Sequence, residues 1–244
     1  MDALPITELT LRQFSGGRAI RIVAFFALIP VLFALIFLID SEGTAPIEFI
    51  ATLFEEIIAP TIMPLAILVL ATNALGNELE DRTMVYLVLK PLSRMRIVLE
   101  KYAAIVITAT IMLWLGTLAT FLVAMRGDAA ENLDMLAAIW MSVFFAVIGY
   151  GALFLMISLL IPRALLAGIL YSLLWETTFS RFIPGIRVFS IRHYVQSIYA
   201  RVFDNPVAGV DEPLRLISAI VTIVVIAGVT LAIASWRLST MNLE

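Results

Sequence analysis

Long runs of apolar residues, separated by short polar segments, form the main pattern along this chain. The six longest runs cover residues 22–39, 57–76, 102–125, 135–161, 164–180 and 214–236. A helix rises about 1.5 Å per residue, so about 20 mainly apolar residues cross the roughly 30 Å hydrocarbon core of a bilayer. The runs carry almost no charge, with Glu176 as the exception. The pattern predicts an all-α polytopic membrane protein, with six transmembrane helices in one domain over residues 22–244.

Two shorter segments are amphipathic instead. Within residues 1–21, the stretch 5–20 predicts a short helix at the inner membrane interface, ended by Gly16–Gly17 before the first span. The loop 181–213, between the fifth and sixth runs, is longer than a plain connection needs. Five of its apolar residues share one helical face: Ile191, Tyr194, Val195, Ile198 and Val202. This spacing predicts a helical insertion, capped by Ser190, that rests on the outer leaflet.

Composition excludes several kinds of chemistry. The chain is 62% hydrophobic and 14% charged, and it contains no cysteine. Disulfides, thiolate metal ligands and cysteine nucleophiles are therefore excluded. The one histidine, His193, is a poor metal site by itself, and the spans contain no Ser/His pair or paired carboxylates. We expect no catalysis, no bound metal or cofactor in this chain, and no nucleic-acid partner.

Lysine and arginine near the ends of the spans indicate orientation, because they are enriched in cytoplasmic loops. With a cytoplasmic N-terminus, ten of them lie inside and six outside. We therefore predict a multi-pass protein of the cytoplasmic membrane with both termini cytoplasmic. Five arginines fall in the last outer segment: Arg181, Arg187, Arg192, Arg201 and Arg215. They could meet anionic lipid headgroups, an anionic substrate or an external partner at the 181–213 loop, or be simple surface charge.

The segment 76–101 between the second and third runs is unusually charged. It holds nine charged residues: Glu78, Glu80, Asp81, Arg82, Lys90, Arg94, Arg96, Glu100 and Lys101. Its apolar stretch Met84–Leu89 is far too short to span, Pro91 would break a helix, and Ser93 can cap the next one. Two interpretations remain open at this point. The charges only enforce orientation, or the segment docks on a soluble partner.

A resemblance favours the second interpretation. Glu78-Leu-Glu-Asp-Arg-Thr83, followed by Lys90-Pro91-Leu-Ser-Arg94 and then Lys101, resembles the signature of small permease subunits of type-2 ABC transporters. Arg82 stands where that family usually has glycine. The resemblance implies an interfacial coupling helix, at about 77–90, that fits a cleft in a separate ATP-hydrolysing subunit. The contact residues it implies are Glu78, Glu80, Asp81, Arg82, Thr83, Lys90, Pro91, Arg94 and Lys101.

The resemblance also implies the assembly. Two ATPase copies would bind ATP and Mg²⁺, and a second permease subunit, identical or paralogous, would face this one. The chain itself has no G-x-x-x-x-G-K-[ST] loop, which agrees with ATP binding on a partner. Spans two and five would line the path between the permeases. The candidate path or outer-gate residues are Thr72, Asn73, Trp175, Glu176 and Thr177.

These candidate residues also suit purely structural roles. Threonine in a span commonly holds helices together, and Glu176 could pair with Arg181 or another loop arginine. An intramembrane carboxylate is also a functional candidate. The function predicted is a permease subunit that couples ATP hydrolysis to export or transmembrane conformational work. The alternative is a secondary transporter or channel without an ATPase, which would favour an ionisable relay or inverted repeats.

Overall fold

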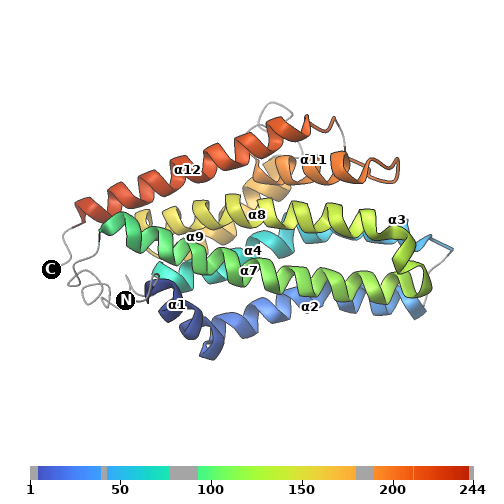
Figure 1. The fold of residues 1–244 in the computed structure, drawn as a ribbon, viewed down its shortest axis with the longest axis horizontal. Helices are drawn as coiled ribbons and strands as arrows, with labels where there is room; N and C mark the ends of the chain where they lie inside the picture. The colour runs from blue at the N-terminus through green and yellow to red at the C-terminus, as the bar shows by residue number, and fades with distance from the viewer. Residues whose placement is uncertain (1–4, 40–42, 77–92, 180–189, 211, 242–244) are drawn as a thin grey trace.

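The computed structural model describes residues 5–39, 43–76, 93–179, 190–210 and 212–241. Throughout these residues the regular structure is helical and no strand occurs, which confirms the all-α class (Figure 1). The elements are α1 (Pro5–Gly16), α2 (Arg18–Ile39), α3 (Pro46–Leu53), η1 (Phe54–Ile62), α4 (Met63–Ala71), η2 (Thr72–Gly76), α7 (Arg94–Met125), η3 (Arg126–Asn132), α8 (Leu133–Leu160), α9 (Ala164–Leu170), η4 (Tyr171–Phe179), α11 (Ile191–Phe203) and α12 (Leu216–Thr240).

Several of these helices can cross a membrane. Among the described residues, four continuous helical segments are long and apolar enough: Arg18–Ile39, Pro46–Gly76, Arg94–Leu160 and Leu216–Thr240. The third of them joins α7 and α8, which fold back on each other at η3 (Figure 1). Ala164–Glu176 forms a shorter apolar helix. The chain is therefore a multi-pass membrane protein, and the number of six spans stays a prediction.

The amphipathic segments form helices at the predicted places. α1 ends at Gly16 and α2 begins at Arg18, in agreement with the break predicted at Gly16–Gly17. α11 begins at Ile191, and the Ser190 side chain accepts a hydrogen bond from the His193 amide at 3.4 Å, as an N-cap does. Helices α2 and α7 begin earlier than their apolar runs, because the backbone continues as helix into the flanking polar residues.

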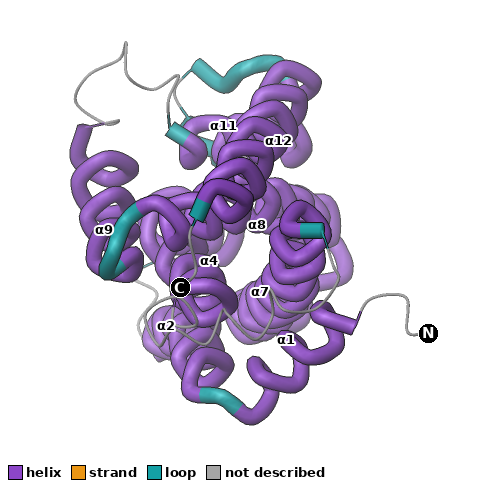
Figure 2. Tube along the Cα trace, turned by 90° about the vertical axis from the view of Figure 1, so that its left-hand side faces the viewer, coloured by secondary structure: helices purple, strands orange, loops and turns teal. Residues whose placement is uncertain are grey.

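α8 is the central helix of the bundle. It packs against α4, α7, α9, α11 and α12, and Figure 2 shows these helices end-on around it. Glycine at position 149 permits part of this packing, since a Cβ there would lie 3.2 Å from the Ile191 side chain and 3.3 Å from that of Ile223. α9 and η4 lie at the edge of the bundle (Figure 2).

Gly116 lies where two long helices approach each other closely. A Cβ at this position would lie 2.5 Å from the carbonyl oxygen of Ala27 and 2.9 Å from its Cβ. α2 and α7 therefore meet backbone to backbone, as small residues allow between membrane helices. Gly228 of α12, by contrast, has no atom within 4 Å of a Cβ built on it.

We predict opposite effects for alanine at these two glycines. Gly116→Ala should destabilise the protein by about 1–3 kcal/mol, because α2 must move away from α7. Gly228→Ala should be neutral or stabilising by up to about 1 kcal/mol, because alanine favours the helix. Unfolding of the purified protein in detergent, followed by circular dichroism, measures both. Equal changes in stability in the two variants would contradict the close contact between α2 and α7.

Candidate functional site

Of the segment predicted to dock on a partner, the structure describes only the two flanks. Seven of the predicted contact residues lie outside the described residues: Glu78, Glu80, Asp81, Arg82, Thr83, Lys90 and Pro91. Arg94 and Lys101 lie in the first turns of α7, and η2 ends at Gly76 on the other side. The end of η2, the start of α7 and α1 lie at the same end of the molecule (Figure 1).

Lys101 joins these two flanks. Its side chain is 1% exposed, and Nζ donates a 2.6 Å hydrogen bond to the carbonyl oxygen of Ala74 in η2. The last carbonyls of a helix have no partner within the helix, and a cation near them is favourable. The Lys101 ammonium therefore caps the end of the second apolar segment and holds it against α7. Its predicted contact with another protein is not tested by this geometry and stays a prediction.

Glu100 makes the corresponding link to α1. Its side chain is 3% exposed, and Oε2 accepts hydrogen bonds from the amides of Ile6 (2.8 Å) and Thr7 (3.2 Å) in the first turn of α1. The Thr7 hydroxyl donates in turn to the Glu100 carbonyl at 3.1 Å. A carboxylate at a helix N-terminus satisfies unpaired amides and matches the helix dipole. α1 is thus attached to α7 through its own N-terminus.

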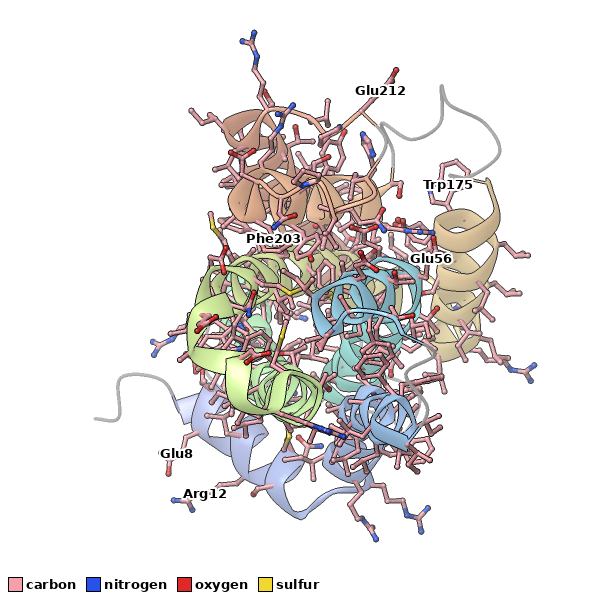
Figure 3. All side chains as sticks on the ribbon, turned by 90° about the vertical axis from the view of Figure 1, so that its right-hand side faces the viewer. Glu8, Arg12, Glu56, Trp175, Phe203 and Glu212 are labelled. Atoms are coloured by element: carbon pink, nitrogen blue, oxygen red, sulfur yellow. The ribbon has the colours of Figure 1, made fainter. Side chains whose placement is uncertain are left out.

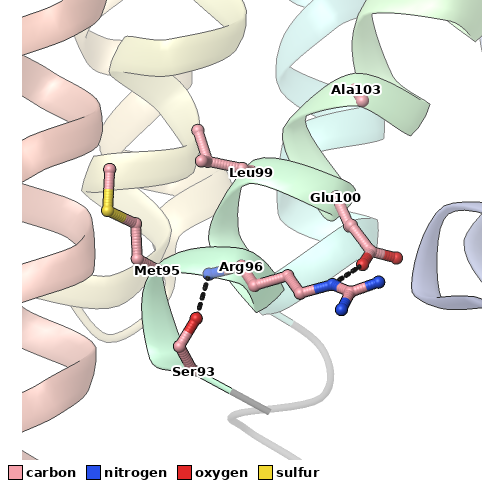
Figure 4. A pocket seen from close by; sticks show the side chains of 6 residues that line it. All are labelled: Ser93, Met95, Arg96, Leu99, Glu100 and Ala103. Carbon is pink, nitrogen blue, oxygen red and sulfur yellow. Dashed lines mark hydrogen bonds and ion pairs between the residues drawn. The ribbon is translucent and has the colours of Figure 1, made fainter. Parts of the chain in front are cut away.

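Two arginines in the first turns of α7 make further contacts beside Glu100 and Lys101. Arg96 donates from Nε to Glu100 Oε1 at 2.6 Å, and its amide donates to the Ser93 hydroxyl at 3.3 Å (Figure 4). Arg94 donates from Nη1 to the carbonyl oxygen of Leu238, near the end of α12, at 3.3 Å. The first turns of α7 therefore bind α1, η2 and α12 together. We call Arg94, Arg96, Glu100 and Lys101 the α7 cluster.

Glu176 is the centre of a second polar cluster, at the start of α11. α11 lies on the other side of the molecule from α1 (Figure 1). The Glu176 side chain is completely buried. Oε1 accepts from the Tyr171 hydroxyl (2.8 Å) and the Ile191 amide (3.1 Å), and Oε2 from the Ser190 hydroxyl (2.5 Å) and the Arg192 amide (3.3 Å). Glu176 thus caps the N-terminus of α11, and the Arg192 guanidinium reaches its backbone carbonyl at 3.5 Å.

The same arginine bridges α11 to η1. Arg192 Nη2 and Gln196 Nε2 both donate to the carbonyl oxygen of Glu55, at 3.3 Å and 2.8 Å. In the π-helical register of η1, the residue that would donate to this carbonyl is Pro60, which has no N–H. Two side chains of α11 therefore supply the hydrogen bonds that the proline cannot. No local pattern in the sequence indicates this pairing, because Glu55 lies 137 residues before Arg192.

Aromatic packing holds the rest of α11 in place. The rings of Tyr199 and Phe54 lie 4.4 Å apart between centroids, and Tyr199 is fully buried. Burial raises the pKa of the Tyr199 phenol further above physiological pH. α11 is consequently a packed part of the bundle rather than a helix that only touches its surface.

The predicted path residues lie at two different levels. Thr72 is buried and donates to the Leu68 carbonyl of its own helix at 2.8 Å, and Asn73 beside it is half-buried. Both lie near the α7 cluster, whereas Trp175 is half-buried at the far end of the α9–η4 helix (Figure 3). Thr177 belongs to η4, and its side chain lies outside the described residues. These residues are therefore not gathered into one pocket in the described structure.

Comparison with known proteins identifies a family. A family model described as ABC-2 family transporter protein matches residues 18–182, which is more than half of the chain. The matched range runs from the start of α2 to just beyond η4 and includes the charged segment. A comparison with curated proteins gives no match.

The Glu100 link predicts that α1 detaches when the carboxylate is lost. Hydrogen bonds to a charged group contribute about 1.5–3 kcal/mol, so Glu100→Ala should increase the opened population of α1 by about tenfold or more. Trypsin cleavage after Arg12 and Arg18 measures this opening. Glu8→Ala is the matched control, because it removes only an exposed ion pair with Arg12. Equal cleavage of the two variants would show that Glu100 does not hold α1.

The Glu176 cluster predicts a local effect on α11. Glu176→Ala should accelerate amide hydrogen exchange across residues 191–203 by about tenfold or more, because the amides and hydroxyls it satisfies lose their acceptor. Glu176→Gln should have a smaller effect, since the amide oxygen can still accept. The exposed residue Glu48 provides the control variant Glu48→Ala. Unchanged exchange in Glu176→Ala would refute the cap.

Proposed function

The chain belongs to the ABC-2 family of transporter membrane proteins, and from this we propose that it is a permease subunit driven by a separate ATPase. ATP and Mg²⁺ bind on that ATPase subunit, and its conformational cycle drives export or other conformational work across the membrane. The contact is the segment 77–101, with a coupling helix at about 77–90 that fits the ATPase surface.

The α7 cluster is the observation that carries this proposal. A force applied to residues 77–92 reaches η2 on one side and α7 on the other. Because Lys101 joins those two flanks, the force moves them together. Glu100 and Arg94 extend the same connection to α1 and to the end of α12. One contact at this loop can therefore displace four parts of the bundle at once.

The arrangement of the chain ends supports the proposed orientation. Glu100 holds the start of α1, and Arg94 holds the end of α12, both beside the start of α7. The first and last described helices thus begin and end at the same end of the molecule (Figure 1). This agrees with both termini on the cytoplasmic side, where the ATPase binds.

A second permease subunit, identical or paralogous, completes the proposed assembly together with two ATPase copies. α9 and η4 carry an exposed set of leucines: Leu165, Leu166, Leu170, Leu173 and Leu174. On their other side they approach the second segment closely, since a Cβ at Gly168 would lie 2.2 Å from Leu68 Cδ1. The leucine face suits packing against a second permease, with spans two and five beside the path.

Co-purification tests the proposed coupling segment. Wild-type protein extracted in mild detergent should retain a stoichiometric nucleotide-binding subunit and ATPase activity, and Glu78→Ala combined with Arg94→Ala should lose most of both. Arg215→Ala is the matched control, because this exposed arginine precedes α12 at the opposite end of that helix from Leu238. Thermal unfolding should show that the helices remain folded in all variants.

Two results would overturn the proposal. If the double variant retained the subunit and its activity, docking through 77–101 would be wrong. If the wild-type protein purified alone and carried out transport in liposomes driven by a proton gradient, the secondary-transporter alternative would replace it.

A further inference from the structure

An open groove of about 370 Å³ lies along the first turns of α7. It is lined by Ser93, Met95, Arg96, Leu99, Glu100 and Ala103. Figure 4 shows that Met95 and Leu99 extend to one side of the helix, and Arg96 and Glu100 to the other. The groove therefore combines an apolar wall with a charged wall, and α7 itself forms its base.

The apolar wall continues as a stripe along α7. Exposed apolar side chains recur at intervals of four or eight residues, in a row that winds gradually around α7: Met95, Leu99, Ile107, Ile111 and Leu115. This stripe belongs to a segment long and apolar enough to cross a membrane. An exposed apolar face in such a segment suits contact with lipid chains. The groove is thus the end of a lipid-facing stripe.

The neighbouring end of α12 indicates the level of the groove in the membrane. Arg94 hydrogen-bonds to the Leu238 carbonyl, so the start of α7 lies beside the last turns of α12. In those turns Trp236 is 64% exposed. Tryptophan is enriched at the membrane–water interface, where its ring lies among the lipid headgroups. The charged wall of the groove is therefore at headgroup level.

Among the described charged side chains at the groove, positive charge is in excess. The Arg96 side chain is 43% exposed, while that of Glu100 is 3% exposed. The Glu100 carboxylate already accepts hydrogen bonds from Arg96, Ile6 and Thr7. Arg94 adds a second positive charge next to the groove. Two arginines and one buried carboxylate favour an anionic ligand over a zwitterionic one.

We propose that this groove binds one anionic phospholipid. Its phosphate lies beside Arg96 and Ser93, and one acyl chain follows Leu99 and Ala103 toward Ile107. The site depends only on the membrane location of α7 and does not require the proposed ATPase partner. A lipid bound here would contact the α7 cluster directly, so the membrane composition would influence how firmly α1 is attached.

Lipid-dependent stability of the purified protein tests the site. Phosphatidylglycerol and phosphatidylcholine with the same acyl chains are added to the protein in neutral detergent. Thermal unfolding and native mass spectrometry then report stabilisation and bound lipid. Phosphatidylglycerol should raise the unfolding temperature clearly more than phosphatidylcholine does and should remain bound as one molecule. Equal stabilisation by the two lipids would overturn the proposal.

A pair of variants that differ only in charge provides the sharpest comparison. Met95→Glu places a negative charge in the groove and should weaken phosphatidylglycerol binding by about tenfold or more, because like charges repel. Met95→Gln has nearly the same size and should bind like the wild type. If Met95→Glu binds phosphatidylglycerol as the wild type does, the groove is not the site.

A second pair tests shape independently of charge and decides the matter if Met95→Glu does not fold. Ala103→Trp fills the groove and should abolish the phosphatidylglycerol-specific effect. Ile111→Trp, about two turns beyond Ala103 on α7 and outside both the groove lining and the path given to the acyl chain, should preserve it.

Discussion

Helix ends inside a membrane protein must have their backbone groups hydrogen-bonded, because apolar surroundings offer no water to satisfy them. Among the described residues, charged side chains do this at several helix ends. Lys101 caps the end of the second segment, Glu100 caps the start of α1, and Glu176 caps the start of α11. The burial of each charge is offset by the hydrogen bonds it makes. The arrangement of the bundle depends on these three contacts.

The same contacts connect stability with the proposed mechanism. A charge that satisfies the end of another helix also transmits displacement to it, because the hydrogen bonds hold only in one relative position. Arg192 and Gln196 show the same relation at the other side of the molecule, where they satisfy the carbonyl that Pro60 leaves unpaired. Helices far apart in the sequence are therefore coupled through a few polar groups rather than through apolar packing alone.

Prediction from sequence succeeded where a feature depends on local periodicity. The apolar runs located the membrane helices, the amphipathic pattern located α1 and α11, and Ser93 and Ser190 cap their helices as expected. It was incomplete where partners come from distant segments. Glu100 was visible as a charge beside a span, but nothing near it in the sequence indicated that its partners are amides at residues 6 and 7. For Glu176 one interpretation was pairing with a loop arginine, and its partners among the described residues include a tyrosine, a serine and two backbone amides.

The sequence by itself determined the helical class, the membrane location and the resemblance to a transporter permease, since these follow from run length, hydropathy and a local motif. Only the tertiary structure decided which charge meets which helix end, and that Thr72 and Trp175 lie at different levels. The physical reason is that apolar burial in lipid is non-directional, so periodicity identifies helices without specifying their neighbours. Hydrogen bonds between a buried charge and a helix terminus are directional, and their partners are determined by how the whole bundle packs.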